Sequence, residues 1–66
     1  MTPSDPEIVH SATLFLELHG EEAVTKARDM VRTMRERGDN DGADRWLQII
    51  VAIESQQRRA NGGMPQ

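Results

Sequence analysis

The sequence predicts an all-α protein, a small three-helix unit in which an antiparallel hairpin of the second and third helices is completed by the first. Three observations predict this fold. Apolar residues recur at spacings of three and four through most of the chain, as they do on one face of an amphipathic helix. Glycine-containing breaks divide this pattern into segments. No segment alternates between apolar and polar residues as a strand does.

The first predicted helix runs from Pro6 to about Leu18. Asp5 carries an oxygen that can cap the free N–H groups at its start, and Pro6 fits the first helical position. Leu14 and Leu18 lie on the flank of the apolar face, so they are candidates for a second contact. The apolar face itself comprises Ile8, Val9, Ala12, Phe15 and Leu16.

The first break is placed at His19 and Gly20. Glycine can adopt the left-handed conformation that ends a helix, and Glu21 and Glu22 suit the positive first turn of a new one. One long helix with a kink at Gly20 is the alternative, because the apolar register is nearly unbroken across it. An interior glycine costs a helix only about 1 kcal/mol, so it does not forbid continuation.

The second predicted helix spans residues 21–37 and closes at Gly38. Residues 39–42 are all turn formers, and either Asn40 or Asp41 can cap the next helix. A connection of about four residues returns the chain as an antiparallel neighbour. The inward positions of this second helix are Ala23, Val24, Ala27, Met30, Val31 and Met34.

The third predicted helix runs from about Asp41 to Gln57 or Arg59 and is the most apolar part of the chain. Residues 1–60 are expected to form a single helical domain, and residues 61–66, with two glycines and a proline, a disordered tail. The apolar face of the third helix comprises Ala43, Trp46, Ile50 and Ile53, widened by Leu47 and Ile49, with Val51 as a smaller apolar spot on the opposite side.

A chain of 66 residues and 7.4 kDa has room for one domain. At this length only about 60% of the unfolded surface becomes buried, so a monomer is marginally stable. The chain has no cysteine, which excludes disulfides and thiolate metal sites. Good helix packing or association with another chain must therefore stabilise it. No apolar run approaches a membrane span and no signal peptide is evident, so a cytoplasmic protein is expected.

The charge is unevenly distributed along the chain. The net charge of −3 and the pI of about 5.2 argue mildly against a nucleic-acid partner. The first 25 residues contain acids and no lysine or arginine, whereas bases crowd the segment that follows. The acids are Asp5, Glu7, Glu17, Glu21 and Glu22, and the bases are Lys26, Arg28, Arg32, Arg35 and Arg37.

Three of these bases form a stripe on the second helix. Arg28, Arg32 and Arg35 are spaced at i, i+4 and i+7, so they share one helix face. The stripe is a candidate contact for phosphates or for an acidic protein surface. The alternative, which is favoured, is a solvated face that pairs locally with Asp29 and Glu36.

Metal binding and catalysis are not expected. Aligning Gly42 with the glycine of a calcium loop puts Arg37 and Gln48 where the anchoring carboxylates belong. His10 and His19, nine residues apart, point about 180° away from each other on one helix. No nucleophile motif or glycine-rich phosphate loop is present, and a small helical unit offers little cleft. The sequence thus predicts a non-catalytic protein without a cofactor.

A DNA-reading helix-turn-helix is also disfavoured, because its recognition helix must expose polar and basic residues. The third helix is apolar and carries Asp41, Asp44 and Glu54 against Arg45 alone until its end. A nucleic-acid-associated regulator that uses the arginine stripe is therefore the second hypothesis. The first is a small interaction or accessory protein.

Two features favour association with a protein. Trp46 is either the centre of the core or, as tryptophan often is, an anchor of an interface. Leu14, Leu18 and Val51 are apolar positions that a thin core cannot all cover, and an uncovered apolar patch usually marks an association site. A two-fold homodimer is expected, with a different protein as the alternative partner.

Several short motifs resemble a family of small uncharacterised proteobacterial proteins. In that family a His-Gly-acid-acid-Ala step, a Gly-Asp-x-x-Gly turn and a Trp-x-x-Ile-x-x-Ala-Ile-Glu helix follow one another. The resemblance implies a bacterial cytosolic setting and supplies no catalytic or binding residue. It covers roughly residues 8–57 and is carried by Leu18-His19-Gly20-Glu21-Glu22-Ala23, by Gly38-Asp39-Asn40-Asp41-Gly42-Ala43, and by Trp46, Ile49, Ala52, Ile53 and Glu54.

Overall fold

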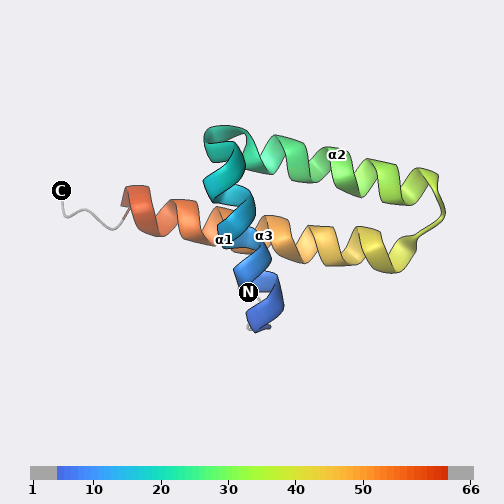
Figure 1. The fold of residues 1–66 in the computed structure, drawn as a ribbon, viewed down its shortest axis with the longest axis horizontal. Helices are drawn as coiled ribbons and strands as arrows, with labels where there is room; N and C mark the ends of the chain where they lie inside the picture. The colour runs from blue at the N-terminus through green and yellow to red at the C-terminus, as the bar shows by residue number, and fades with distance from the viewer. Residues whose placement is uncertain (1–4, 63–66) are drawn as a thin grey trace.

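The computed structural model describes the backbone of residues 5–62 and the side chains of residues 5–59. Helix α1 comprises Pro6–His19, a short 3₁₀ turn η1 comprises Gly20–Glu22, α2 comprises Ala23–Glu36 and α3 comprises Asn40–Gly62 (Figure 1). The described residues contain no strand. The all-α prediction is therefore confirmed.

Helix α1 begins as the sequence predicts. The carboxylate of Asp5 accepts a hydrogen bond from the Glu7 N–H at 2.9 Å, and Pro6 is the first helical residue. The cap satisfies one of the free N–H groups of the first turn, and the proline has no N–H to leave unpaired. Helix α1 is thus fixed at its start by its own sequence.

The junction of α1 and α2 combines features of both sequence interpretations. Gly20 has φ 57°, and its N–H donates to the Leu16 carbonyl. A side chain at this φ is strained, which explains the glycine. The chain nevertheless stays helical, because η1 leads directly into α2 and residues 6–36 contain no non-helical residue. The chain bends sharply at η1, so α1 and α2 point in different directions (Figure 1).

The α2–α3 turn is built from two successive caps. Gly38 has φ 77°, its N–H donates to the Arg35 carbonyl, and the Asp39 N–H donates to the Met34 carbonyl. This pair of bonds is a Schellman motif, which ends α2. The Asp39 carboxylate then accepts from the Gly42 N–H at 2.8 Å and so caps α3. The prediction that Asn40 or Asp41 caps this helix is wrong.

Gly42 lies close to the capping carboxylate. A Cβ on Gly42 would lie 2.6 Å from Asp39 Oδ2, so the Asp39 side chain would have to shift to admit it. The turn lays α2 and α3 antiparallel along each other (Figure 1).

Helix α3 is longer than predicted. It has 23 residues and ends at Gly62, beyond the expected end at Gln57 or Arg59. At 1.5 Å per residue it is about 35 Å long, against about 21 Å for α2, so its C-terminal part extends past the hairpin (Figure 1). The predicted tail began at residue 61, and its residues 63–66, like residues 1–4, lie outside the described part.

The core lies around α3, which packs against both α2 and α1. Five of the ten buried apolar residues in the described part are alanines, so the helices approach closely and the core is thin. Its largest fully buried side chains are Ile8 and Ile53. The buried apolar residues are Ile8, Ala12, Ala23, Ala27, Val31, Ala43, Ile49, Ile50, Ala52 and Ile53.

Polar contacts fix how α1 crosses α3. The Gln56 amide donates to the Thr13 hydroxyl at 3.0 Å and to the Val9 carbonyl at 3.4 Å. Arg45 forms an ion pair with Glu7 at 3.1 Å, and both side chains are well exposed. An exposed pair contributes only about 0 to 1 kcal/mol. The partly buried Gln56 contact therefore sets the crossing more than the ion pair does.

The Asp39 cap yields a prediction. We expect Asp39→Ala to lower the free energy of unfolding by about 1 kcal/mol, because the Gly42 N–H loses its acceptor. Urea unfolding followed by circular dichroism measures the change. Asn40→Ala is the matched control, since no side-chain hydrogen bond of Asn40 occurs in the described structure, and it should change stability by much less. A larger loss for Asn40→Ala would show that the cap is assigned to the wrong residue.

Candidate functional site

The structure places six of the seven candidate interaction residues on two surfaces. One lies between α2 and α3, and we call it the arginine groove. The other lies between α1 and α3, and we call it the tryptophan groove. The first receives Arg28, Arg32 and Arg35, the second receives Leu14, Leu18 and Trp46, and Val51 lines neither.

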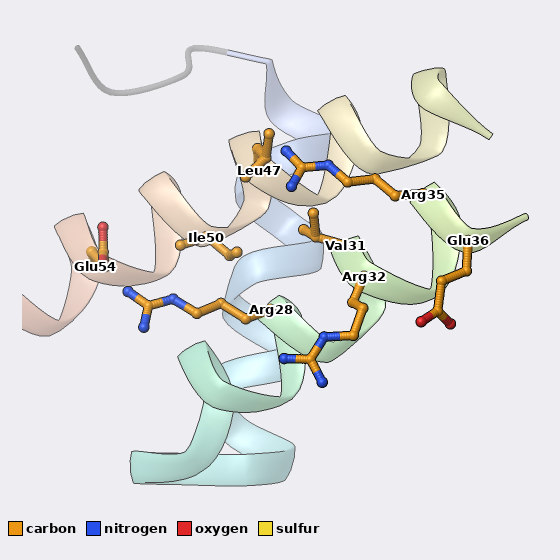
Figure 2. A pocket seen from close by; sticks show the side chains of 8 residues that line it. All are labelled: Arg28, Val31, Arg32, Arg35, Glu36, Leu47, Ile50 and Glu54. Carbon is orange, nitrogen blue, oxygen red and sulfur yellow. The ribbon is translucent and has the colours of Figure 1, made fainter. Parts of the chain in front are cut away.

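The arginine groove has an apolar floor and a charged rim. Its volume is about 610 Å³, and Val31 and Ile50, both buried, form its floor beside the more exposed Leu47. Figure 2 shows Arg28 extending toward Glu54 and Arg35 extending toward Leu47, whereas Arg32 points away from α3. The full lining is Arg28, Val31, Arg32, Arg35, Glu36, Leu47, Ile50 and Glu54.

The three arginines do not pair locally as the favoured interpretation of the stripe expected. Within residues 5–59 the structure contains one ion pair, between Arg45 and Glu7, and no carboxylate lies within 4.0 Å of Arg28, Arg32 or Arg35. No hydrogen bond from these guanidinium groups to a described residue occurs either. Each arginine has five N–H donors. The groove therefore presents donors that are free to bind an acidic group.

The arginine groove lies on the face of the hairpin that α1 does not cover. All of its lining residues come from α2 and α3. Figure 2 shows α1 running behind the two helices, on the far side from the groove. One face of the hairpin is thus packed against α1, and the other is open.

The tryptophan groove lies on the α1 side, with a volume of about 340 Å³. Trp46 packs edge-to-face on Phe15 with ring centroids 5.1 Å apart, and Phe15 also contacts the His19 ring at 4.4 Å. Trp46 is only partly buried, so it is at the edge of the core and not at its centre. The lining is Ser11, Leu14, Phe15, Leu18, Arg45, Trp46 and Ile49.

Beside the tryptophan groove, the end of α1 carries exposed apolar and acidic residues together. Leu14 is 51% exposed and Leu18 is 76% exposed. They are one helical turn apart and so lie on the same face. Exposed carboxylates lie next to them in sequence. We call this set the leucine ridge, and it comprises Leu14, Glu17, Leu18, Glu21 and Glu22.

Val51 does not join Leu14 and Leu18 in one patch, as the sequence interpretation assumed. Val51 is exposed and lies one helical turn from Leu47, which places the two on one side of α3. Val51 therefore extends the edge of the arginine groove. Sequence reasoning also missed Leu47 as a surface residue. The sequence contained a signal for this position, because Leu47 and Val51 are four residues apart and lie off the main apolar stripe of the helix.

Neither a metal centre nor a membrane span is found in the described part of the chain. No cluster of three or more histidine, cysteine, aspartate or glutamate side chains there is arranged to hold an ion. None of its helices combines the length and the apolar content needed to cross a bilayer. Comparison with protein families, with curated proteins and with solved structures finds no match. The resemblance to the proteobacterial family therefore stays a prediction.

The partial burial of Trp46 yields a second prediction. We expect Trp46→Ala to cost about 2 kcal/mol of stability, below the roughly 3 to 5 kcal/mol typical of a fully buried aromatic residue. Ile53→Ala removes a smaller but fully buried side chain and should cost more, about 3 kcal/mol. Chemical unfolding of the two variants shows which substitution lowers the free energy of unfolding more. A greater loss for Trp46→Ala would place this tryptophan at the centre of the core.

Proposed function

We propose that the chain is a small non-catalytic interaction protein of the bacterial cytoplasm, a three-helix unit that associates with a second copy of itself. The observation that carries this proposal is the exposure of Leu14 and Leu18 beside the partly buried Trp46. Single exposed leucines are common on protein surfaces. Two of them one turn apart, next to an aromatic groove, form the kind of patch that marks a contact with another protein.

The thin core supports the same proposal. Because alanines supply half of the buried apolar residues, folding alone buries little large apolar surface. A chain of this size then gains stability from a partner. Association buries the exposed leucines and leaves the alanine-mediated helix packing unchanged.

The magnitudes show that the two leucines cannot bind a second copy alone. Full burial of a leucine contributes about 1.5 to 3 kcal/mol. Scaled by the exposed fractions of Leu14 and Leu18, the pair offers about 2 to 4 kcal/mol per copy. Association costs at least about 4 kcal/mol in lost freedom of motion. Further contacts must contribute, and the two grooves are the surfaces that can supply them.

A nucleic-acid-associated regulator is the second candidate function. The unpaired Arg28, Arg32 and Arg35 favour it, since phosphates bind such donors. The groove, however, also contains Glu36 and Glu54 and no aromatic side chain on which a base could stack. Together with the net charge of −3, this composition makes an acidic and partly apolar protein surface the better ligand.

Self-association yields a third prediction. At micromolar concentrations, sedimentation equilibrium should give a mass of at least twice the 7.4 kDa of one chain. Leu18→Ser should reduce the association, because it removes the most exposed apolar side chain of the leucine ridge. Val9→Ser is the control, since Val9 is exposed but lines neither groove. A single species of 7.4 kDa for the wild type would rule out self-association and assign the ridge to another protein.

The alternative function yields a fourth prediction. We expect no electrophoretic shift of random duplex DNA or single-stranded RNA at tens of micromolar protein and low salt. A nucleic-acid regulator would shift both, and the shift would weaken steeply as salt rises, because binding to phosphates releases counterions. Such a salt-dependent shift, abolished by Arg28→Gln together with Arg35→Gln, would favour the second candidate function over the first.

A further inference from the structure

We propose that the arginine groove of one copy receives the leucine ridge of another, so that the chains associate head to tail. This inference rests on the proposed self-association and adds to it the two surfaces that meet. The occupant of the groove is thus a second copy of this chain, and the contact joins two different surfaces.

The two surfaces match in chemistry. The groove offers an apolar floor of Val31 and Ile50 beside the guanidinium groups of Arg28 and Arg35, which have no partners in the described structure, whereas Arg32 points away from α3. The ridge offers the exposed Leu14 and Leu18, flanked by three exposed glutamates. When the ridge leucines of one copy pack on the groove floor of the other, apolar surface of both copies is buried. The ridge glutamates then lie beside the groove arginines and form charge-assisted hydrogen bonds with them.

The two surfaces are also of comparable size. Arg28 and Arg35 are seven residues apart on α2, which is about 10 Å along the helix axis. Leu14 and Leu18 are four residues apart on α1, about 6 Å along its axis, and Glu21 follows after the bend in η1. The two leucines therefore fit between the arginines at the two ends of the rim.

Charge disfavours the contacts that join identical surfaces. A ridge against a second ridge brings Glu17, Glu21 and Glu22 toward their own copies. A groove against a second groove does the same with its three arginines. Like charges across an interface repel and opposite charges attract. The pairing of ridge with groove is therefore the one that the charges of this chain select.

The ridge of one chain cannot bind in the groove of the same chain. The ridge is on α1, and the groove opens on the face of the hairpin away from α1 (Figure 2). The ridge must therefore reach the groove of a different copy. A pair joined through one such contact still has one free ridge and one free groove. Such a contact builds chains or rings, in place of the two-fold dimer expected from the sequence.

The test uses two variants of the full chain, each defective in one surface. Arg28→Glu with Arg35→Glu disables the groove, and Glu17→Lys with Leu18→Ser disables the ridge. All four side chains are exposed, and none of them takes part in an ion pair of the described structure. Circular dichroism checks that both variants are folded. Arg28→Gln with Arg35→Gln is the conservative version if charge reversal unfolds the chain.

We expect each variant to associate at least tenfold more weakly than the wild type. An equimolar mixture should form a heterodimer of twice 7.4 kDa and nothing larger, because one working ridge and one working groove remain. Raising NaCl from about 50 mM to about 500 mM should weaken this heterodimer, since the contact is partly electrostatic. Lys26→Glu with Arg59→Glu, which changes the charge equally outside the groove, should associate like the wild type.

Two results would overturn the inference, and they differ in whether the proposed self-association also fails. If the groove variant associates as strongly as the wild type while the ridge variant does not, the ridge pairs with itself. The proposed self-association then stands and the head-to-tail contact is wrong. If the wild type is monomeric at every concentration tested, self-association fails and the inference fails with it.

Discussion

The structure depends on one constraint, which is that α3 packs against two helices that cross it in different directions. Helix α2 lies antiparallel along it and α1 runs across it (Figure 1). Small residues such as Ala43 and Ala52 on α3, and Ala12, Ala23 and Ala27 on the other two helices, make both close approaches possible. Isoleucines at 49, 50 and 53 fill the space between the three. The core is accordingly a single thin layer around α3.

The same arrangement separates the charges of the chain. Five acidic residues precede Lys26 with no lysine or arginine among them, and all eight lysines and arginines lie at Lys26 or later. Folding places α1 on one face of the hairpin and leaves the arginine groove on the other. Among residues 5–59, acid and base form one ion pair, the exposed contact of Glu7 with Arg45. The separation produces two surfaces of opposite charge, each with apolar residues between its charged groups.

The sequence predicted the features that local chemistry determines. The Asp5 cap, the left-handed Gly20 and Gly38 and the apolar faces depend on residues close in the chain. The α3 cap was misassigned because residues 39–41 all have capping side chains, and only the Schellman motif at Gly38 selects Asp39. The positions of Trp46 and Val51 were not predictable, because they depend on the direction in which α1 crosses the hairpin. That direction is set by contacts distant in sequence, such as Gln56 with Thr13.

Stability and association are coupled in a chain with so thin a core. A partner that binds only the folded chain stabilises it by mass action, in proportion to the logarithm of its concentration. The leucine ridge contributes little to the isolated fold, because Leu18 is three-quarters exposed. In the proposed association it contributes to the folded population only when it is bound. The residues that complete the burial of apolar surface are then the same residues that determine the partner, so selection for a stable fold and selection for a specific contact act on one surface.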